Sequence, residues 1–484
     1  MKKIFLLLLI FSFMIWSGCD PETPTTPKFV TTPSQAALTK MVAVGNSLTA
    51  GFQSSGLKAS FQQNSYPYLI AQQLGRAADF QQPLIGEPGI GSPAGKTPQS
   101  FNPATGAITQ DDLTVNPLLL LQNAYLARPY DNLGVPGADL NDALNTTSAL
   151  NNPFFDLVLR NPNFGGTTML EQAIALQPTL LLMWLGNNDV LGAALDGGDA
   201  TQITSQADFQ TRLTSVLTQI RTELTSTAIL MANIPNVTDI PYVHFMDITF
   251  HAIPALGIND PVPVLFDATF QPIDFDPSDG VLYLPLWTQE VMGTLSHVLL
   301  TGLLAYQSGF GIPDSAHLRD LGFSGAEARA FADGMTQQGL ISNHMPIPGN
   351  MTLTVSELTT ISNAVTGFNQ IISSPQLQGA FVYLVVDVNS LLTELNTVGL
   401  DGLSGDFVFL APSNTAFSLD GVHPNNAGHA VIANAFIDAL NAAPFSLGIT
   451  KLTASEYAGQ YLGKRPSAKS LKSSLDGVRA IFRK

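Results

Sequence analysis

The stretch Thr179-Leu-Leu-Leu-Met-Trp-Leu-Gly-Asn-Asn-Asp189 decides the fold class. Its apolar part, Thr179 to Leu185, is bounded by Pro178 on one side and Gly186 on the other. An uninterrupted short apolar run of this kind predicts a strand that is buried on both faces, as in a parallel sheet covered by helices. The polar residues that follow lie where the strand ends, and parallel sheets place their functional loops at that edge.

Similar runs recur along the chain and alternate with helical patterns. Thr168 with Glu171, and Thr354 with Glu357, form capping-box patterns at the starts of two helices. Short apolar strands separated by amphipathic helices predict a parallel sheet with helices on both sides. The other expected strands cover residues 41–45, 130–133, 227–232 and 381–386, and further helices are expected over 65–74, 209–224 and 424–440.

Two stretches break this alternation, at about 77–127 and 235–350. We interpret them as insertions at the ends of strands, where α/β folds place variable loops. Residues 291–306 and 325–339 look helical, which leaves open a separate helical subdomain in the second insertion. The apolar run 117–121 and the Phe-rich region 245–275 indicate either an apolar acyl pocket under a lid or ordinary core.

Composition narrows the class of protein. The chain has 484 residues, of which 45% are hydrophobic and 12% charged, so it can bury a large core and is not generally disordered. Its net charge of −16 argues against nucleic acid as a partner, because phosphate binding needs clustered Lys and Arg. A single cysteine excludes an intramolecular disulfide and a multi-cysteine metal site.

The N-terminus has the pattern of a targeting segment. A basic start, Met1 to Lys3, precedes an apolar run from Ile4 to Trp16 that is short for a transmembrane helix, and Cys19 follows. This arrangement resembles the bacterial lipoprotein signal, which implies removal of residues 1–18 and lipidation of Cys19. An ordinary signal peptide with an incidental cysteine is the alternative.

Under the lipoprotein interpretation, residues 19–40 form a Pro- and Thr-rich tether that holds the protein at a membrane of the bacterial cell envelope, on the periplasmic or the cell-surface side. The C-terminal residues 446–484 form a basic tail. Such a tail either touches anionic lipid or is simply solvated.

Four polar segments carry residues suited to nucleophilic catalysis. A serine hydroxyl needs a histidine base, a group that orients the histidine, and donors for the oxyanion. Ser47 follows the first strand directly, and Asp420 precedes His423 by three residues across a turn. The backbone N–H of Gly137 and the side-chain amide of Asn188 are candidate oxyanion donors. Each segment also has a plain structural explanation as a cap or a turn. The other six histidines lack such a companion, and we expect them to be structural.

Together the four segments resemble the SGNH, or GDSL-type, hydrolase family. They read Gly45-Asn46-Ser47-Leu48, Asn132 to Gly137, Gly186-Asn187-Asn188-Asp189 and Asp420-Gly421-Val422-His423, in the chain order of the family's blocks. The resemblance spans residues 41–445 apart from the two insertions. Asn46 stands where the family has an aspartate, which removes a charge next to the site.

This resemblance implies a three-layer α/β/α fold with a central, mostly parallel five-stranded sheet of flavodoxin-like order. It implies Ser47 as nucleophile, His423 as base and Asp420 as the group that orients it. The oxyanion hole would be formed by Ser47 N–H, Gly137 N–H and Asn188, with no metal and no cofactor. The expected activity is hydrolysis of acyl, acetyl or lipid esters by an esterase or lipase. Deacetylation of a polysaccharide or peptidoglycan, and non-catalytic binding by a surface lipoprotein, are the alternatives.

Overall fold

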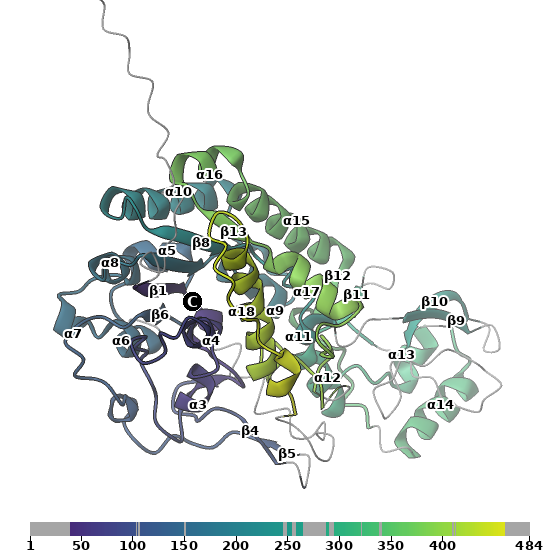
Figure 1. Cartoon of the computed structure of the whole chain (residues 1–484). Coiled ribbons are helices and arrows are strands. Elements are labelled where there is room, and N and C mark those ends of the chain that lie inside the picture. Colours follow the sequence, from purple (N-terminus) through teal and green to yellow (C-terminus); the bar gives the residue numbers. More distant parts are fainter. Residues whose placement is uncertain are drawn as a thin grey trace, which may run out of the picture.

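We describe the fold from a computed structural model, shown in Figure 1. It describes residues 39–102, 104, 107–149, 152–244, 249–253, 258–264, 287–289, 295–320, 322–337, 341–408, 411 and 413–459. The signal segment, Cys19, most of the tether and the tail from residue 460 onward lie outside the described residues, so the predictions made for them stay predictions.

The centre of the fold is a five-stranded sheet in the order β13-β8-β7-β1-β6, and all its neighbouring strands are parallel. If the five strands are numbered along the chain and read across the sheet from the β6 edge, their order is 2-1-3-4-5. This is the order of doubly wound flavodoxin-like sheets. The strands are β1 (Met41–Gly45), β6 (Asn132–Gly134), β7 (Leu180–Trp184), β8 (Ala228–Ala232) and β13 (Leu384–Val386). Every residue of β1, β7 and β8 is buried, which confirms the interpretation of the apolar runs as interior strands.

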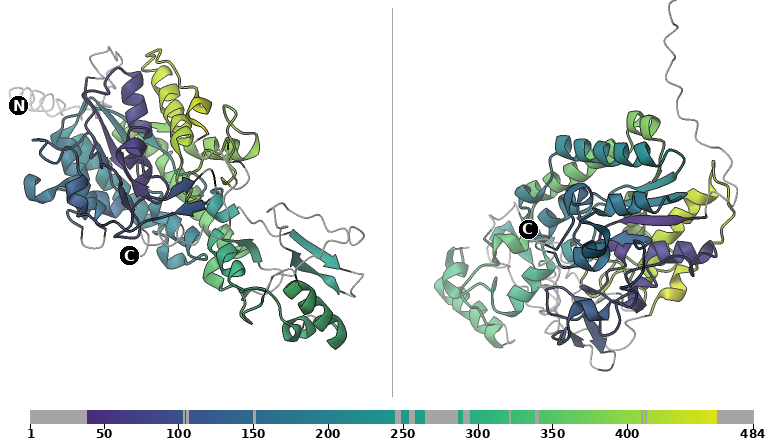
Figure 2. Two further views of the ribbon diagram at one scale, coloured as in Figure 1. Left: turned by 90° about the horizontal axis from the view of Figure 1, so that it is seen from below. Right: turned by 90° about the vertical axis from the view of Figure 1, so that its left-hand side faces the viewer.

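Helices cover both faces of the sheet, so the fold has three layers (Figure 2). One face is covered by α5 (Leu140–Asn145), α8 (Met169–Ala175), α9 (Asn188–Leu195), α10 (Gln206–Glu223) and α15 (Val355–Ile372). Phe209 of α10 stacks on Phe368 of α15 with ring centroids 4.1 Å apart. Both predicted capping boxes form, with hydrogen bonds in both directions between Thr168 and Glu171 and between Thr354 and Glu357.

The opposite face is covered by α4 (Tyr66–Gln73) and α18 (Asn426–Asn441), with α17 (Val388–Thr397) beside α18. Tyr66 of α4 stacks on Phe436 of α18 with ring centroids 4.9 Å apart. The first and last parts of the described chain therefore lie side by side. Short helices complete this body: α2 (Ser47–Ala50), α3 (Ala59–Gln62), α6 (Phe154–Leu159), α7 (Asn161–Phe164) and α16 (Pro375–Phe381).

Several predicted boundaries were wrong. The strand expected from residue 381 begins only at Leu384, because α16 continues to Phe381. The last helix begins at Asn426 rather than Pro424, because Asn425 caps it by accepting a hydrogen bond from Gly428 N–H. Residues 446–459, which we placed in the tail, pack on α18, where Asn434 and Asn441 hydrogen-bond to Leu452 and Ile449.

The first insertion packs largely against the body. It contains β3 (Ile90–Gly91), which pairs with β2 (Gly56–Leu57), and a hairpin of β4 (Ser100–Asn102) and β5 (Ala107–Thr109). The apolar run at 117–121 is a 3-10 turn, Pro117–Leu120, whose Leu119 side chain is 80% exposed. Leu118 and Leu119 are therefore exposed, whereas Leu120 and Leu121 pack against the core.

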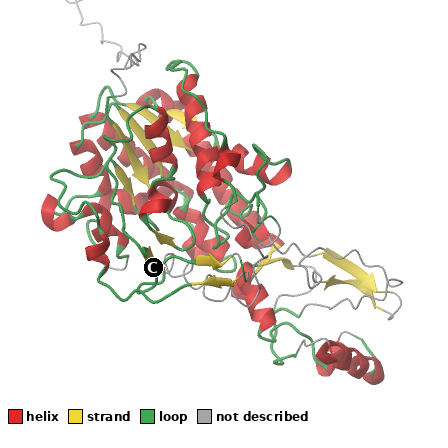
Figure 3. Cartoon of the chain, turned by 60° about the horizontal axis from the view of Figure 1, so that its bottom comes forward, coloured by secondary structure: helices red, strands yellow, loops and turns green. Residues whose placement is uncertain are grey.

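The second insertion extends to one side of the body (Figure 3). The helix expected over 291–306 was partly wrong, because among its described residues Leu295–Val298 form strand β11, and helix α12 spans Leu300–Gln307. Most of the Phe-rich region lies outside the described residues. Its other described elements include α11 (Pro241–His244), β9 (Thr249–Ile253), β10 (Ile258–Val264), α13 (Ser315–Asp320) and α14 (Gly325–Gln337). Strand β11 pairs with β12 (Thr352–Thr354), which directly follows the insertion.

Gly45, at the end of β1, permits the turn into α2. A Cβ at this position would lie 2.0 Å from Thr49 Oγ1 and 2.7 Å from the Trp184 carbonyl oxygen. We expect Gly45→Ala to lower the free energy of unfolding by about 3 kcal/mol or more, because this close-packed strand end has no room for a methyl group. Chemical denaturation measures the change. Gly379→Ala is the control, since a Cβ at that helical position has open space around it and should stabilise by about 0.5–1 kcal/mol. Equal effects of the two substitutions would contradict the packing described here.

Candidate active site

Ser47, His423 and Asp420 form a continuous hydrogen-bonded chain. His423 Nε2 lies 3.0 Å from Ser47 Oγ, and His423 Nδ1 lies 3.0 Å from Asp420 Oδ2. Because an ionised carboxylate only accepts hydrogen bonds, Nδ1 carries the proton and Nε2 is left to accept from the serine hydroxyl. The serine and the histidine are 376 residues apart in the chain, and the fold brings them together as predicted.

The turn between β1 and α2 places Ser47. Asn46 is the N-cap of α2, and its Oδ1 accepts a hydrogen bond from Leu48 N–H at 3.0 Å. Ser47 is therefore the first residue of the helix, and its own N–H lies beyond the reach of the intrahelical hydrogen bonds. Asn46 keeps the capping role that an aspartate would have here, without adding a charge.

Asp420 is fully buried and surrounded by donors. Its Oδ1 accepts hydrogen bonds from the N–H groups of Val422 and His423 and from the Ser418 hydroxyl, at 2.9–3.0 Å. Its Oδ2 accepts from Ser55 N–H at 2.8 Å as well as from His423. Burial raises the pKa of Asp420, but the electrostatic influence of His423 and the hydrogen bonds from His423 and from Val422 N–H outweigh burial and hold the pKa below its ordinary value. Asp420 is therefore ionised and fixes the imidazole ring.

Ser54 and Ser55 support the site and were not predicted. Both have positive φ angles, 51° and 56°, in the left-handed region that serine rarely adopts. This conformation directs Ser54 N–H to Ser418 Oγ at 2.9 Å and Ser55 N–H to Asp420. The segment after the nucleophile is thus bound to the segment that carries the acid and the base. No sequence signal indicated this role, because serines in a polar loop are common.

The candidate oxyanion donors lie at the ends of the strands beside β1. Gly45 pairs with Gly134 of β6 and with Trp184 of β7, so the loops that carry Gly137 and Asn188 begin level with the nucleophile. Gly137 has a φ of +81°, which favours glycine. Asn188 Nδ2 donates to the Ala138 carbonyl oxygen at 2.8 Å, which joins the two loops and leaves its second amide hydrogen for a substrate. In the described part of the chain, the N–H groups of Ser47 and Gly137 have no protein acceptor.

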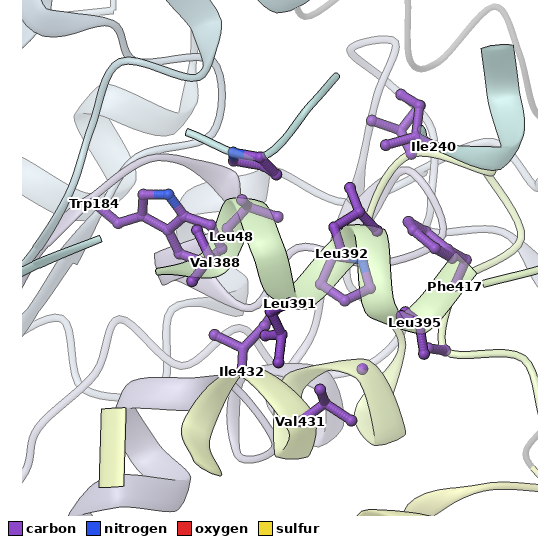
Figure 4. Close-up of a pocket in the computed structure, with 15 residues that line it drawn as sticks. Leu48, Trp184, Ile240, Val388, Leu391, Leu392, Leu395, Phe417, Val431 and Ile432 are labelled. Atoms are coloured by element: carbon purple, nitrogen blue, oxygen red, sulfur yellow. The ribbon is translucent and has the colours of Figure 1, made fainter. Parts of the chain in front are cut away.

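Two cavities of different character adjoin these residues. A polar cleft of about 900 Å³ is lined by Gly137 and Asn188 together with Asp139, Asp208 and Arg212. An apolar pocket of about 90 Å³ lies between α17 and α18 and is partly lined by Leu48, the neighbour of the nucleophile (Figure 4). The site thus offers a polar surface and an apolar one.

Asp189 and His429 are buried titratable groups that lie outside the hydrogen-bonded chain of Ser47, His423 and Asp420. Burial, together with the Asp139 charge, raises the pKa of Asp189 to about 7, although Leu140 N–H donates to it and Arg212 lies 3.7 Å away. Burial and the neighbouring His423 lower the pKa of His429 to about 3, and neither of its ring nitrogens has a hydrogen-bond partner in the structure. His429 is therefore neutral and adds no charge beside the base.

The remaining candidate features lie elsewhere. His344 pairs with Asp314 at 2.8 Å and His317 stacks on Trp287, both in the second insertion. Within the described residues, no group of three or more His, Cys, Asp or Glu side chains could hold a metal ion. None of the helices searched there combines the length and hydrophobicity needed to span a membrane.

Comparison of the chain with models of known families, with curated proteins and with solved structures gave no match. The assignment of a function therefore depends on the residues and geometry of the site itself.

Asp189 gives a pH-dependent prediction. Its pKa is raised in the folded protein, so folding binds a proton between the ordinary carboxyl pKa of 3.8 and about 7. This contribution stabilises the fold at low pH and is lost as the pH rises through about 7. We expect Asp189→Asn, which keeps an acceptor for Leu140 N–H, to remove that loss, so that its stability relative to wild type increases from pH 5 to pH 8. Denaturation at the two pH values measures the difference. A constant difference would contradict the raised pKa.

Proposed function

We propose that this chain is a serine hydrolase of the SGNH type that cleaves carboxylic esters through an acyl-serine intermediate. The single observation that carries this proposal is the pair of 3.0 Å contacts that join Ser47 Oγ to His423 and His423 to a buried, ionised Asp420. A nucleophile within hydrogen-bond reach of a base that a third group orients is the diagnostic arrangement of nucleophilic catalysis.

In the first step Ser47 Oγ attacks the ester carbonyl carbon and His423 Nε2 takes up the hydroxyl proton. The carbonyl oxygen becomes an oxyanion, which Ser47 N–H, Gly137 N–H and the Asn188 amide stabilise. The C–O bond to the alcohol then breaks, and the proton on Nε2 passes to the leaving oxygen. Asp420 stabilises the imidazolium while it exists.

In the second step a water molecule attacks the acyl-serine carbonyl carbon while His423 takes a proton from it. The bond from the carbonyl carbon to Ser47 Oγ breaks, the proton returns to the serine, and the carboxylic acid leaves. This sequence uses only residues of the chain and water.

Deacetylation of a glycan is a second candidate, and the polar cleft favours it. Carboxylate, amide and guanidinium groups line the cleft beside Gly137 and Asn188, and such groups hydrogen-bond to sugar hydroxyls. Release of acetate from acetylated xylan, compared with hydrolysis of p-nitrophenyl acetate, tests this candidate.

A non-catalytic surface lipoprotein would keep the same fold without turnover. The lipid anchor at Cys19 and the location in the cell envelope are compatible with either role, and we propose them together with the hydrolase. Radiolabelled palmitate incorporated into wild type but not into Cys19→Ala would support the anchor.

Ser47→Ala should lower ester hydrolysis on the order of 10⁴-fold or more, because the nucleophile is removed. The measurement is kcat/KM on p-nitrophenyl acetate together with covalent labelling by a short fluorophosphonate probe. Ser60→Ala, at an exposed serine of α3, is the matched control and should keep both activity and label. Full activity of Ser47→Ala would end the proposal, and absence of a label on wild type would favour the binding protein.

Asn188→Ala should lower kcat on the order of 10²–10³-fold with little change in KM, because the amide acts mainly on the transition state. Since Asn188 also holds the Ala138 carbonyl oxygen, a melting temperature for each variant separates misfolding from lost catalysis. Asn163→Ala, at an exposed asparagine of α7, is the control and should leave kcat unchanged. A change in KM alone would assign Asn188 to substrate binding instead.

A further inference from the structure

The apolar pocket beside the catalytic residues has a definite composition. Its walls come from α17, α18 and the loops at the sheet edge, and Figure 4 shows side chains of the two helices turned toward a common space. Among the lining side chains, only Trp184 carries a polar atom, and its Nε1 donates to the Asn233 carbonyl oxygen at 3.0 Å. The pocket therefore offers a ligand no side-chain hydrogen-bonding group and suits a hydrocarbon.

Both reacting residues have a sequence neighbour in this wall. Leu48 follows the nucleophile, and Val422 and Pro424 flank His423. The pocket therefore borders the two chain segments that carry Ser47 and His423. The lining residues differ in burial. Val388 and Val431 are at most 7% exposed and mark the closed end, whereas the partly exposed lining residues are Leu48, Pro235, Leu391, Leu392 and Ile432.

The two halves of an ester have different fates in the proposed reaction. The alcohol leaves after the first step, whereas the acyl group stays bonded to Ser47 Oγ until water attacks. The wide polar cleft, of about 900 Å³, suits the half that leaves, and the narrow apolar pocket beside Leu48 suits the half that stays.

We propose that the apolar pocket between α17 and α18 binds the acyl chain of the substrate and selects short chains of about four or five carbons. This inference rests on the proposed function. The volume of about 90 Å³ is smaller than the roughly 150 Å³ of a cavity that holds benzene, so it accommodates about three or four carbon atoms beyond the carbonyl.

The experiment measures kcat/KM for p-nitrophenyl esters from acetyl to octanoyl. Each buried methylene should raise kcat/KM about fourfold, from about 0.8 kcal/mol per group, so butanoyl should exceed acetyl about 15-fold. Chains longer than about five carbons should give no further gain or a loss. A maximum at acetyl would overturn the inference and favour the deacetylase.

Leu391→Trp should fill the opening of the pocket and reduce the butanoyl-to-acetyl ratio to about one. Val431→Ala should enlarge the closed end and move the optimum toward hexanoyl. Val398→Trp is the matched control, because Val398 follows α17 but is 77% exposed and does not line the pocket. It should keep the wild-type chain-length profile.

A second series holds the acyl group at acetyl and varies the alcohol from ethyl to pentyl. The ratios in this series should not respond to Leu391→Trp, and a response here instead of in the acyl series would overturn the assignment of the pocket to the acyl chain. Fluorophosphonate labelling of Ser47 separates the two proposals. A labelled enzyme with an acyl profile that neither pocket variant changes refutes the pocket alone, whereas an unlabelled, inactive wild type refutes the hydrolase.

Discussion

The geometry of the site depends on one buried carboxylate. A fully buried Asp420 costs several kcal/mol of solvation unless donors surround its oxygens, and the structure supplies five hydrogen bonds for this purpose. One donor is Ser55, close to the start of the described chain, and the other four belong to residues 418–423. Satisfying this charge therefore binds the two ends of the fold together and sets the distance between Ser47 and His423. The contacts that stabilise the Asp420 charge are also the contacts that position His423. If they were lost, the buried carboxylate would be left without donors.

The sheet order adds a second constraint. Because β1 lies between β6 and β7, the loops after these three strands emerge side by side, and the hydrogen bond from Asn188 to Ala138 joins the outer two. Ser47, Gly137 and Asn188 thus come from loops after neighbouring strands, while Asp420 and His423 come from the loop before α18. The arrangement combines a rigid edge of parallel strands with a loop that the buried carboxylate holds in place.

The sequence predicted much of this site because the residues involved carry local signals. Ser47, Asn188 and the Asp420–His423 turn each follow or precede a recognisable element. Four of the five strands were identified from apolar runs, whereas the segment 130–133 contains Asp131 and Asn132 and overlaps β6 only at residues 132–133. Boundaries failed where a local capping choice decided them, as at Asn425 and at the end of α16. Ser55 and Ser418 could not be found, because their roles arise from backbone conformation and long-range contacts rather than from a pattern. The same holds for the raised pKa of Asp189, which follows from burial that a sequence does not reveal.

The two cavities near Ser47, His423 and Asp420 differ in polarity, and this difference follows from the topology. On the side of Gly137 and Asn188, the walls are helix N-termini and turns, whose caps are polar residues such as Asp139 and Ser205. On the side of α17 and α18, the walls are the apolar faces of two helices that meet over the sheet edge. Helix starts expose polar groups because their N–H donors need acceptors, whereas packed helix faces expose hydrocarbon. The contrast between the polar cleft and the apolar pocket is therefore set by secondary structure rather than by a dedicated recognition loop.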